Sequence, residues 1–190
     1  MNKNSLSSQD LSNQKKNCKA IFLDRDGVIN IEKNYLYKIE DFEFVEGTFS
    51  SLKQLQNLGY KLFIITNQSG VGRGYYTLKD FDKLTSWMIH QFEINDITIS
   101  QVELCPHAPT DKCDCRKPLT GMIDNILQNH DIDLENSWLI GDKGSDIQCA
   151  KNANVKNTIQ VKSGHNFTDK DSIADFICAS IKDVPKIIIS

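Results

Sequence analysis

The sequence predicts an α/β domain in which a doubly wound parallel sheet carries helices on both faces. Short apolar runs alternate along the chain with segments in which apolar residues recur every three or four positions. The runs are continuously apolar, which is typical of strands buried on both faces of a sheet. The chain has 190 residues, of which 39% are hydrophobic and 25% charged, so it has room for one domain with a sizeable core.

The expected strands and helices follow one another in regular alternation. The predicted strands are AIFL (20–23), KLFIIT (61–66), QVELC (101–105), SWLIG (137–141) and NTIQV (157–161), with a further one at ADFI (174–177). The predicted helices are 49–58, 77–92, 120–129 and a short one near Pro185; Thr77 and Asp80 resemble a capping box at the second of them. Residues 1–18 are polar and are predicted to be a flexible N-terminal tail, which leaves one domain at 19–190.

Charge and hydropathy exclude several classes of protein. The formal net charge is −3, which provides no basic field for nonspecific binding of nucleic acid. There is no apolar run near the roughly 20 residues that a membrane helix needs, and no apolar region typical of a secretory signal. We therefore expect a cytoplasmic monomer without nucleic-acid or membrane partners.

Polar residues follow the ends of the predicted strands, where ligands gather in parallel sheets. Asp24 and Asp26 follow the first strand, Thr66 ends the second, and Asp142 follows the fourth. Carboxylates that converge repel one another and any phosphate, so a divalent cation is expected between them. We expect Mg²⁺ with Asp24, Asp26 and Asp142 as ligands, because this ion prefers hard oxygen ligands and phosphate.

These residue types fit hydrolysis of a phosphate ester in two displacements. Asp24 is expected to be the nucleophile and to form an aspartyl phosphate. Asp26 is expected to protonate the leaving alkoxide and later to deprotonate the attacking water. Thr66 and Lys117 are expected to bind the oxygens of the phosphoryl group in transfer.

A second metal site is predicted between the third strand and the following helix. Cys105, His107, Cys113 and Cys115 form CxH and CxC pairs separated by five residues. Three thiolates and one imidazole are a tetrahedral ligand set that Zn²⁺ favours. Because four protein ligands leave no open position, we expect a structural zinc in loop 105–115 that holds Arg116 and Lys117 at the site.

DRDG, ITNQSG, CRKP and GDxxxD resemble the four motifs of the haloacid dehalogenase superfamily. FLDRDGVIN, DFEFVEG, ITNQSGVGRGYY, CPHAPTDKCDCRKP and LIGDK more narrowly resemble its heptose 1,7-bisphosphate 7-phosphatases, over about residues 19–162. The resemblance implies a minimal cap, a small phosphorylated sugar as substrate, and a place in nucleotide-heptose synthesis for lipopolysaccharide or another surface glycan. The substrate contacts that it implies are Glu32, Lys33, Asn34, Tyr35, Asn67, Gln68, Ser69, Arg116 and Lys143.

Other interpretations of these residues stay open. Histidinol-phosphate phosphatases resemble the chain in the same four motifs and in a zinc loop, and a zinc-stabilised binding module would lack at least one essential group. Asp146 is interpreted as a helix cap or as a partner of the catalytic residues. Arg73 is either a substrate contact or a surface residue. His165 has no partner pattern and is interpreted as a surface or loop residue.

Overall fold

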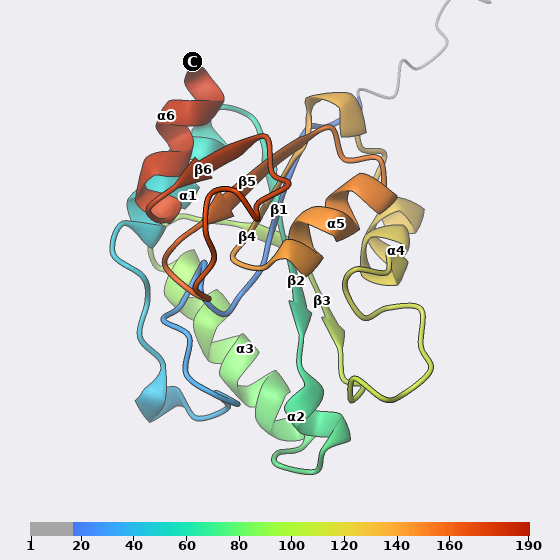
Figure 1. Ribbon diagram of the computed structural model, residues 1–190. Helices are drawn as coiled ribbons and strands as arrows, with labels where there is room; N and C mark the ends of the chain where they lie inside the picture. The colour runs from blue at the N-terminus through green and yellow to red at the C-terminus, as the bar shows by residue number, and fades with distance from the viewer. Residues whose placement is uncertain (1–16) are drawn as a thin grey trace, which may run out of the picture.

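The computed structural model describes residues 17–190 as a central parallel sheet between two layers of helices (Figure 1). Its six strands lie in the order β3-β2-β1-β4-β5-β6, and every neighbouring pair is parallel. The strands are β1 Ala20–Leu23, β2 Lys61–Asn67, β3 Ile99–Cys105, β4 Trp138–Gly141, β5 Asn157–Val161 and β6 Phe176–Cys178. The predicted doubly wound parallel sheet is therefore confirmed.

Alternate residues of the central strand β1 face two separate hydrophobic cores. Ile21 and Leu23 belong to one core, whereas Ala20 and Phe22 belong to the other. All four side chains are fully buried, because β1 lies in the interior of the sheet and helices cover both of its faces. A strand covered on both faces has no place for a polar side chain, which explains the continuous apolar run.

Three helices cover the face to which Ile21 and Leu23 point. They are α1 Thr48–Asn57, α3 Leu78–Glu93 and α6 Val184–Ile189. Leu52 and Leu55 of α1 and Met88 and Phe92 of α3 pack into this core. The predicted capping box begins α3: the Thr77 hydroxyl accepts from the Asp80 N–H, and the Asp80 carboxylate accepts from the Thr77 N–H.

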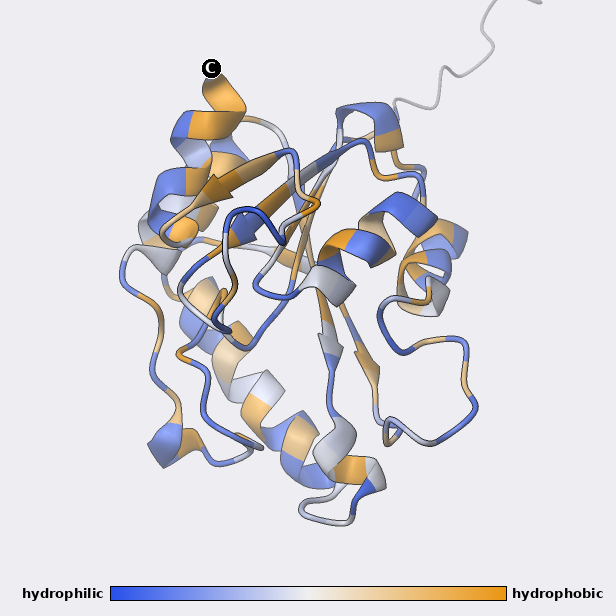
Figure 2. Ribbon diagram, viewed as in Figure 1, coloured by the Kyte–Doolittle hydropathy of each residue, from blue (hydrophilic) through white to orange (hydrophobic). Residues whose placement is uncertain are grey.

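Two helices cover the opposite face, α4 Gly121–Asn129 and α5 Gly144–Asn152. Met122, Ile123 and Ile126 of α4 are fully buried against the sheet, together with the stacked rings of Phe22 and Phe63. Figure 2 shows hydrophobic and hydrophilic bands on α3, α4 and α5, as expected for helices with one buried side.

The connections between these elements differ in length, and the longest are residues 24–47, 106–120 and 162–175. The connections contain the single helical turns η1 Ile39–Asp41, α2 Ser69–Gly72, η2 Leu134–Asn136 and η3 Ile181–Asp183. Between β1 and α1 the described chain holds η1 and no larger insertion, which agrees with a minimal cap. Within residues 17–190 there is no helix whose length and apolar character would let it cross a membrane.

The predicted tail, 1–18, lies outside the described residues except at its end. Cys18 forms a parallel bridge with Ile132, and its backbone N–H donates to Asp131 O at 3.0 Å. The packed structure therefore includes at least the last residue of the segment that the sequence assigns to the tail.

The direction of chain progression reverses between β1 and β4. From β1 the chain moves outward through β2 and β3, then returns to β4 on the other side of β1. The loops that follow these two strands diverge to opposite faces and leave a crevice at the carboxyl edge, which is where such folds bind ligands. Asp24 and Asp142 are the first residues after β1 and β4.

Candidate active site

Asp24 lies at the crevice between β1 and β4 and is almost fully buried. Its backbone N–H donates to Ile140 O at 2.9 Å, which continues the pairing of the two strands to the residue that follows β1. Its Oδ1 atom accepts from the Arg25 N–H at 2.8 Å and lies 2.9 Å from Lys117 Nζ. The carboxylate therefore has a fixed orientation at the end of the central strand.

Lys117 has three acceptors for its ammonium group. Its Nζ atom lies 2.9 Å from Asp24 Oδ1 and 2.8 Å from Asp146 Oδ1, and it donates to Ile65 O at 2.9 Å. The side chain is almost completely buried. Burial alone would lower the pKa of Lys117, but Asp146 and Asp24 raise it above its ordinary value, so the group stays charged. The Lys117 ammonium group thus links the loop before α4 to the end of β1 through Asp24, to β2 through Ile65 and to α5 through Asp146.

Asp146 both caps a helix and contacts Lys117. Its Oδ2 accepts from the Lys143 N–H at 2.9 Å at the start of α5. A Cβ at Gly141 would lie 2.2 Å from Asp146 Cβ, so this approach of α5 to the end of β4 requires glycine. Asp146 therefore fits both parts of the interpretation made from the sequence, a helix cap and a partner of the catalytic residues.

The site has more negative than positive charge. Oxygen atoms of Asp24, Asp142 and Asp146 lie within 4.8 Å of one another, and Lys117 supplies one positive charge against these three carboxylates. Burial raises the pKa of Asp24 to about 8, an effect that Lys117 opposes and that Asp146 and Asp142 reinforce. A divalent cation would remove the excess negative charge and keep Asp24 ionised at neutral pH.

Asp142 has a free oxygen to offer such a cation. Its side chain is fully buried, and its Oδ1 atom has no hydrogen-bond partner among the described residues. A buried carboxylate oxygen without a donor is costly, whereas a hard cation is its natural partner. The donor set of Asp24 and Asp142 therefore fits Mg²⁺.

The carboxylate of Asp26 is held by protein donors. Oδ1 accepts from Asn30 Nδ2 at 2.9 Å, Oδ2 accepts from Gln68 Nε2 at 2.9 Å, and the Arg25 guanidinium contacts both oxygens. Burial alone would raise the pKa of Asp26, but Arg25, Asn30 and Gln68 hold it below its ordinary value. The structure thus gathers Asp146 with Asp24 and Asp142, while the Asp26 carboxylate is engaged elsewhere; its part in cation binding stays a prediction.

Gln68 connects Asp26, the proposed acid/base, to Thr66, which is predicted to bind phosphoryl oxygens. Its Nε2 donates to Thr66 Oγ1 at 2.7 Å as well as to Asp26. Its Oε1 accepts from the Tyr76 hydroxyl at 2.5 Å and from Arg25 Nη2 at 3.3 Å. Burial raises the pKa of Tyr76 to about 12, so its hydroxyl remains a donor. This network holds Asp26 and Thr66 at the same edge of the sheet.

A pocket of about 330 Å³ opens beside Asp26 and Lys117. Its lining includes every residue predicted as a substrate contact, namely Glu32, Lys33, Asn34, Tyr35, Asn67, Gln68, Ser69, Arg116 and Lys143. Four basic side chains line it, Lys33, Arg116, Lys117 and Lys143, against the two carboxylates of Asp26 and Glu32. The pocket therefore suits an anionic ligand larger than a single phosphate.

Asn67 and Tyr35 are among the lining residues that also contact other parts of the protein. Asn67 Oδ1 accepts from the Lys117 N–H at 3.1 Å, and Asn67 Nδ2 donates to Lys117 O at 3.2 Å. Asn67 thus holds the peptide unit of Lys117 against the end of β2. Tyr35 has φ 56°, a left-handed conformation that is rare for a bulky residue, and its exposed ring packs edge-on against Tyr75.

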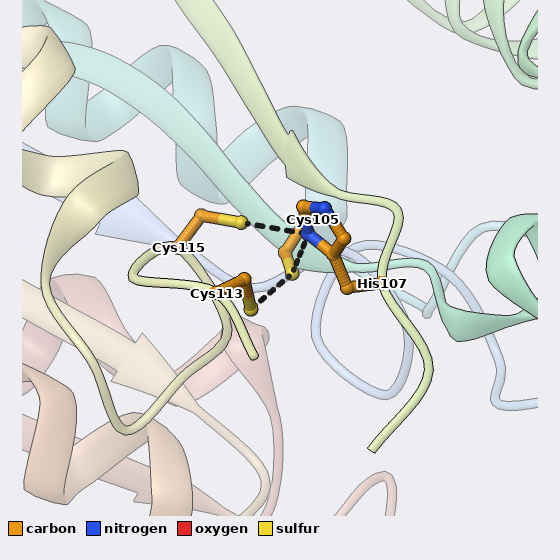
Figure 3. Close-up of side chains that lie close together, drawn as sticks. All are labelled: Cys105, His107, Cys113 and Cys115. Carbon is orange, nitrogen blue, oxygen red and sulfur yellow. Dashed lines mark hydrogen bonds between the residues drawn. The ribbon is translucent and has the colours of Figure 1, made fainter. Parts of the chain in front are cut away.

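The predicted zinc ligands converge in space (Figure 3). Cys105 Sγ lies 3.6 Å from His107 Nδ1 and 3.8 Å from Cys113 Sγ, and His107 Nδ1 lies 3.3 Å from Cys115 Sγ. Burial raises the pKa of the Cys105 and Cys115 thiols, so a metal would be needed to ionise them. The geometry and the Cys₃His donor set fit a four-coordinate zinc.

Three residues of the site are not predicted from the sequence as site residues: Arg25, Tyr76 and His165. Arg25 lies between the two aspartates but is almost fully buried against Asp26. Tyr76 and His165 line the pocket, and His165 Nδ1 lies 2.7 Å from Asp142 Oδ2. His165 lies in an exposed loop, as interpreted from the sequence, and it has in addition a partner, Asp142, that no sequence pattern indicates. The motif sequences mark strand ends, whereas His165 comes from a loop whose path depends on the folded structure. Arg73 is exposed and does not line the pocket.

Comparisons with known proteins agree with this geometry. A HAD-hydrolase-like family model matches residues 114–184. D-glycero-beta-D-manno-heptose-1,7-bisphosphate 7-phosphatase of Helicobacter pylori is 50% identical over 142 residues, covering 74% of this chain and 82% of the relative. D-glycero-alpha-D-manno-heptose-1,7-bisphosphate 7-phosphatase of Campylobacter jejuni is 49% identical over 143 residues, covering 75% and 82%.

A solved structure with the same fold was determined with ligands. It is D,D-heptose 1,7-bisphosphate phosphatase from B. bronchiseptica complexed with magnesium and phosphate, with a TM-score of 0.78 and 26% identity. The similarity covers 90% of this chain and 98% of that one. The order of the strands, the buried Asp24–Lys117 pair and these relatives lead to one conclusion: the chain belongs to the heptose-1,7-bisphosphate 7-phosphatase family of the HAD-like hydrolases.

Proposed function

We propose that the protein is a Mg²⁺-dependent phosphatase that removes the 7-phosphate of D-glycero-D-manno-heptose 1,7-bisphosphate. The observation that carries the proposal is the position of Asp24, a buried carboxylate at the crevice, whose partner Lys117 lines the pocket. Family membership supports the same reaction. The enzyme would act in the cytoplasm, in nucleotide-heptose synthesis for a surface glycan.

The first displacement uses Asp24 as nucleophile. A carboxylate oxygen of Asp24 forms a bond to phosphorus, and the bond between phosphorus and the sugar oxygen breaks. Lys117 and Thr66 would bind the phosphoryl oxygens, which gain charge during transfer. The leaving alkoxide takes a proton from Asp26.

Asp26 must gain that proton before it can donate it. In the ligand-free site its pKa is below its ordinary value, so the carboxylate is ionised. A phosphate group that binds beside it adds negative charge, which raises the pKa of a carboxyl group. In the second displacement, Asp26 takes a proton from water, the water oxygen bonds to phosphorus, and the bond from phosphorus to Asp24 breaks.

Asp24 and Asp142 would hold the Mg²⁺, which would neutralise charge on the carboxylates and on the phosphate. The zinc would have a different task, because its four protein ligands leave no position for a substrate. It would order the loop from Cys105 to Cys115, after which Arg116 and Lys117 follow directly. Close packing supports this role: a Cβ at Gly72 would lie 2.6 Å from the Ala108 backbone nitrogen.

The charge of the pocket favours a bisphosphate over histidinol phosphate. Lys33, Arg116 and Lys143 can attract a second phosphate. Histidinol phosphate has one phosphate and a cationic amine, which is disfavoured because the four basic side chains of the pocket outnumber its two carboxylates, Asp26 and Glu32. The excess of basic side chains is thus the feature that separates the two substrates.

The test is phosphate release with Mg²⁺ and with EDTA, from both anomers of heptose 1,7-bisphosphate and from histidinol phosphate. Both anomers are included because the names of the two relatives differ in the anomer. We expect Mg²⁺-dependent release with a higher kcat/KM for one heptose anomer. A higher kcat/KM for histidinol phosphate would overturn the substrate, and no release from any of them would overturn the reaction.

A further inference from the structure

The loop that follows β5 reaches back across the sheet to Asp142. The backbone N–H of His165 donates to Asp142 Oδ2 at 2.8 Å, and His165 Nδ1 lies 2.7 Å from the same oxygen. A carboxylate oxygen accepts, so Nδ1 carries the proton. One residue therefore occupies one oxygen of Asp142 with two donors, and the other oxygen, Oδ1, has no hydrogen-bond partner in the described chain.

The loop is fitted closely around this carboxylate. A Cβ at Gly164 would lie 2.1 Å from Asp142 Oδ2, and a Cβ at Gly27 would lie 2.6 Å from it. Ser163 Oγ donates to Gly27 O at 2.6 Å, which joins the β5 loop to the turn after Asp26. Backbone from two loops thus encloses Oδ2, so the Asp142 carboxylate cannot rotate freely.

His165 also faces the substrate pocket. About half of its side chain is exposed, and the residue lines the pocket together with Glu32 and Lys143. Its Nδ1 lies 4.0 Å from Glu32 Oε2, and Lys143 Nζ lies 3.9 Å from the same oxygen. His165 therefore lies between Asp142, a proposed ligand of the cation, and Glu32, a predicted substrate contact.

We infer that His165 is a positioning residue for the catalytic cation: its two N–H groups fix Asp142 Oδ2 and so present Oδ1 to Mg²⁺. This inference rests on the Mg²⁺ site of the proposed function. Hydrogen bonds to the outer atoms of a metal ligand set the orientation of that ligand, and their loss typically weakens metal affinity by about 10-fold to 100-fold. The role needs the ring N–H and the close loop, and both can be removed separately.

The first test measures divalent-cation affinity without substrate. Mn²⁺ binding to the full chain is followed from the EPR signal of the free ion, and Mg²⁺ affinity is then obtained by competition. His165→Ala should weaken Mg²⁺ binding by about tenfold, because the backbone donor remains while the ring donor is lost. His165→Asn should restore most of the affinity, since its amide nitrogen can donate from a position similar to that of Nδ1. His90→Ala, which removes an exposed histidine of α3, should bind as the wild type does.

A second pair of variants tests the loop without changing the ring. Gly164→Ala adds a methyl group that meets Asp142 Oδ2, whereas Gly144→Ala adds one at a position with nothing within 4 Å. Gly164→Ala should weaken Mg²⁺ binding and Gly144→Ala should not. This pair also keeps the test decisive if His165→Ala fails to fold.

The outcomes separate this inference from the proposed function. Wild-type affinity in folded His165→Ala, or equal affinities in Gly164→Ala and Gly144→Ala, would overturn the positioning role. Equal loss in His165→Ala and His165→Asn would also contradict it, because a general packing defect would not be rescued by the amide. If the wild type binds Mg²⁺ and His165→Ala binds it more weakly, the inference stands even when no phosphate is released from the heptose. If the wild type binds no divalent cation, the Mg²⁺ site and this inference fail together.

Discussion

Lys117 and Asp24 form a buried ion pair with 2.9 Å between Nζ and Oδ1. The pair joins Asp24, the proposed nucleophile at the end of β1, to the residue that follows the Cys105–Cys115 loop and Arg116. The ammonium group also reaches Asp146 at 2.8 Å. Lys117 thus contacts both the proposed nucleophile and the start of α5, so we expect its removal to disturb the site and the fold together.

Lys117→Met should abolish phosphatase activity and destabilise the fold. It leaves Asp24 and Asp146 buried without their cation, and removal of one partner of a buried pair typically costs about 3–5 kcal/mol. Urea denaturation gives the free energy of unfolding. Lys79→Met, at an exposed lysine of α3, is the control and should change stability little. A Lys117→Met variant with wild-type stability would contradict the burial argument.

Without divalent cations, the stability of the protein should fall as the pH rises from about 4 to 8. The pKa of Asp24 is raised to about 8 in the fold, whereas an unfolded Asp titrates near 3.9. Between these values the folded state binds more protons than the unfolded state, so the free energy of unfolding decreases with pH. Asp24→Asn, which cannot titrate, should flatten this dependence. Urea denaturation at several pH values measures it, and parallel pH curves for the wild type and the variant would refute the assignment.

Gln68→Glu should lower kcat by about tenfold or more. The amide nitrogen of Gln68 donates to both Asp26 and Thr66, and a hydrogen bond to a charged group contributes about 1.5–3 kcal/mol. A carboxylate at this position donates nothing and repels Asp26. Gln128→Glu, on the exposed side of α4, makes the same chemical change as a control. Steady-state kinetics on the heptose bisphosphate measure kcat for both variants. An unchanged kcat in Gln68→Glu would show that Gln68 does not support catalysis.

Cys113→Ser should reduce zinc content and lower the melting temperature together. The cysteine supplies one of four ligands, and structural zinc contributes directly to folding free energy. Elemental analysis of the purified protein measures zinc per chain. Cys178→Ser changes a partly buried cysteine outside the cluster and should keep the zinc. Full zinc content in Cys113→Ser would contradict the ligand set.

The sequence predicts the central strands better than the edges. β1 and β5 have the predicted bounds, because strands covered on both faces need continuous apolar runs. β3 begins at Ile99, two residues before its prediction, and β6 is Phe176–Cys178 where 174–177 was expected. Both lie at the edges of the sheet and are only partly buried, so their apolar pattern is weaker.

The sequence predicts site residues at the ends of strands, but it does not predict those whose position depends on contacts between loops. Asp24 and Asp142 directly follow the buried strands β1 and β4, Thr66 lies near the end of β2, and the pairing of these strands brings the three residues to the same edge of the sheet. The chain bends after Asp24, so Asp26 does not share its contacts as an extended segment would suggest. Arg25 and His165 have their roles through contacts that depend on tertiary packing, and no spacing along the chain marks them.

The most direct test of Asp24 as the nucleophile that removes the 7-phosphate is ³¹P NMR, which follows both phosphates of the substrate separately. Heptose 1,7-bisphosphate is incubated with the wild type and with Asp24→Asn in the presence of Mg²⁺. We expect the wild type to convert the 7-phosphate signal to inorganic phosphate and to leave the 1-phosphate intact, whereas Asp24→Asn should leave both phosphates in place. Loss of the 1-phosphate, or turnover by Asp24→Asn at a rate near that of the wild type, would contradict this expectation.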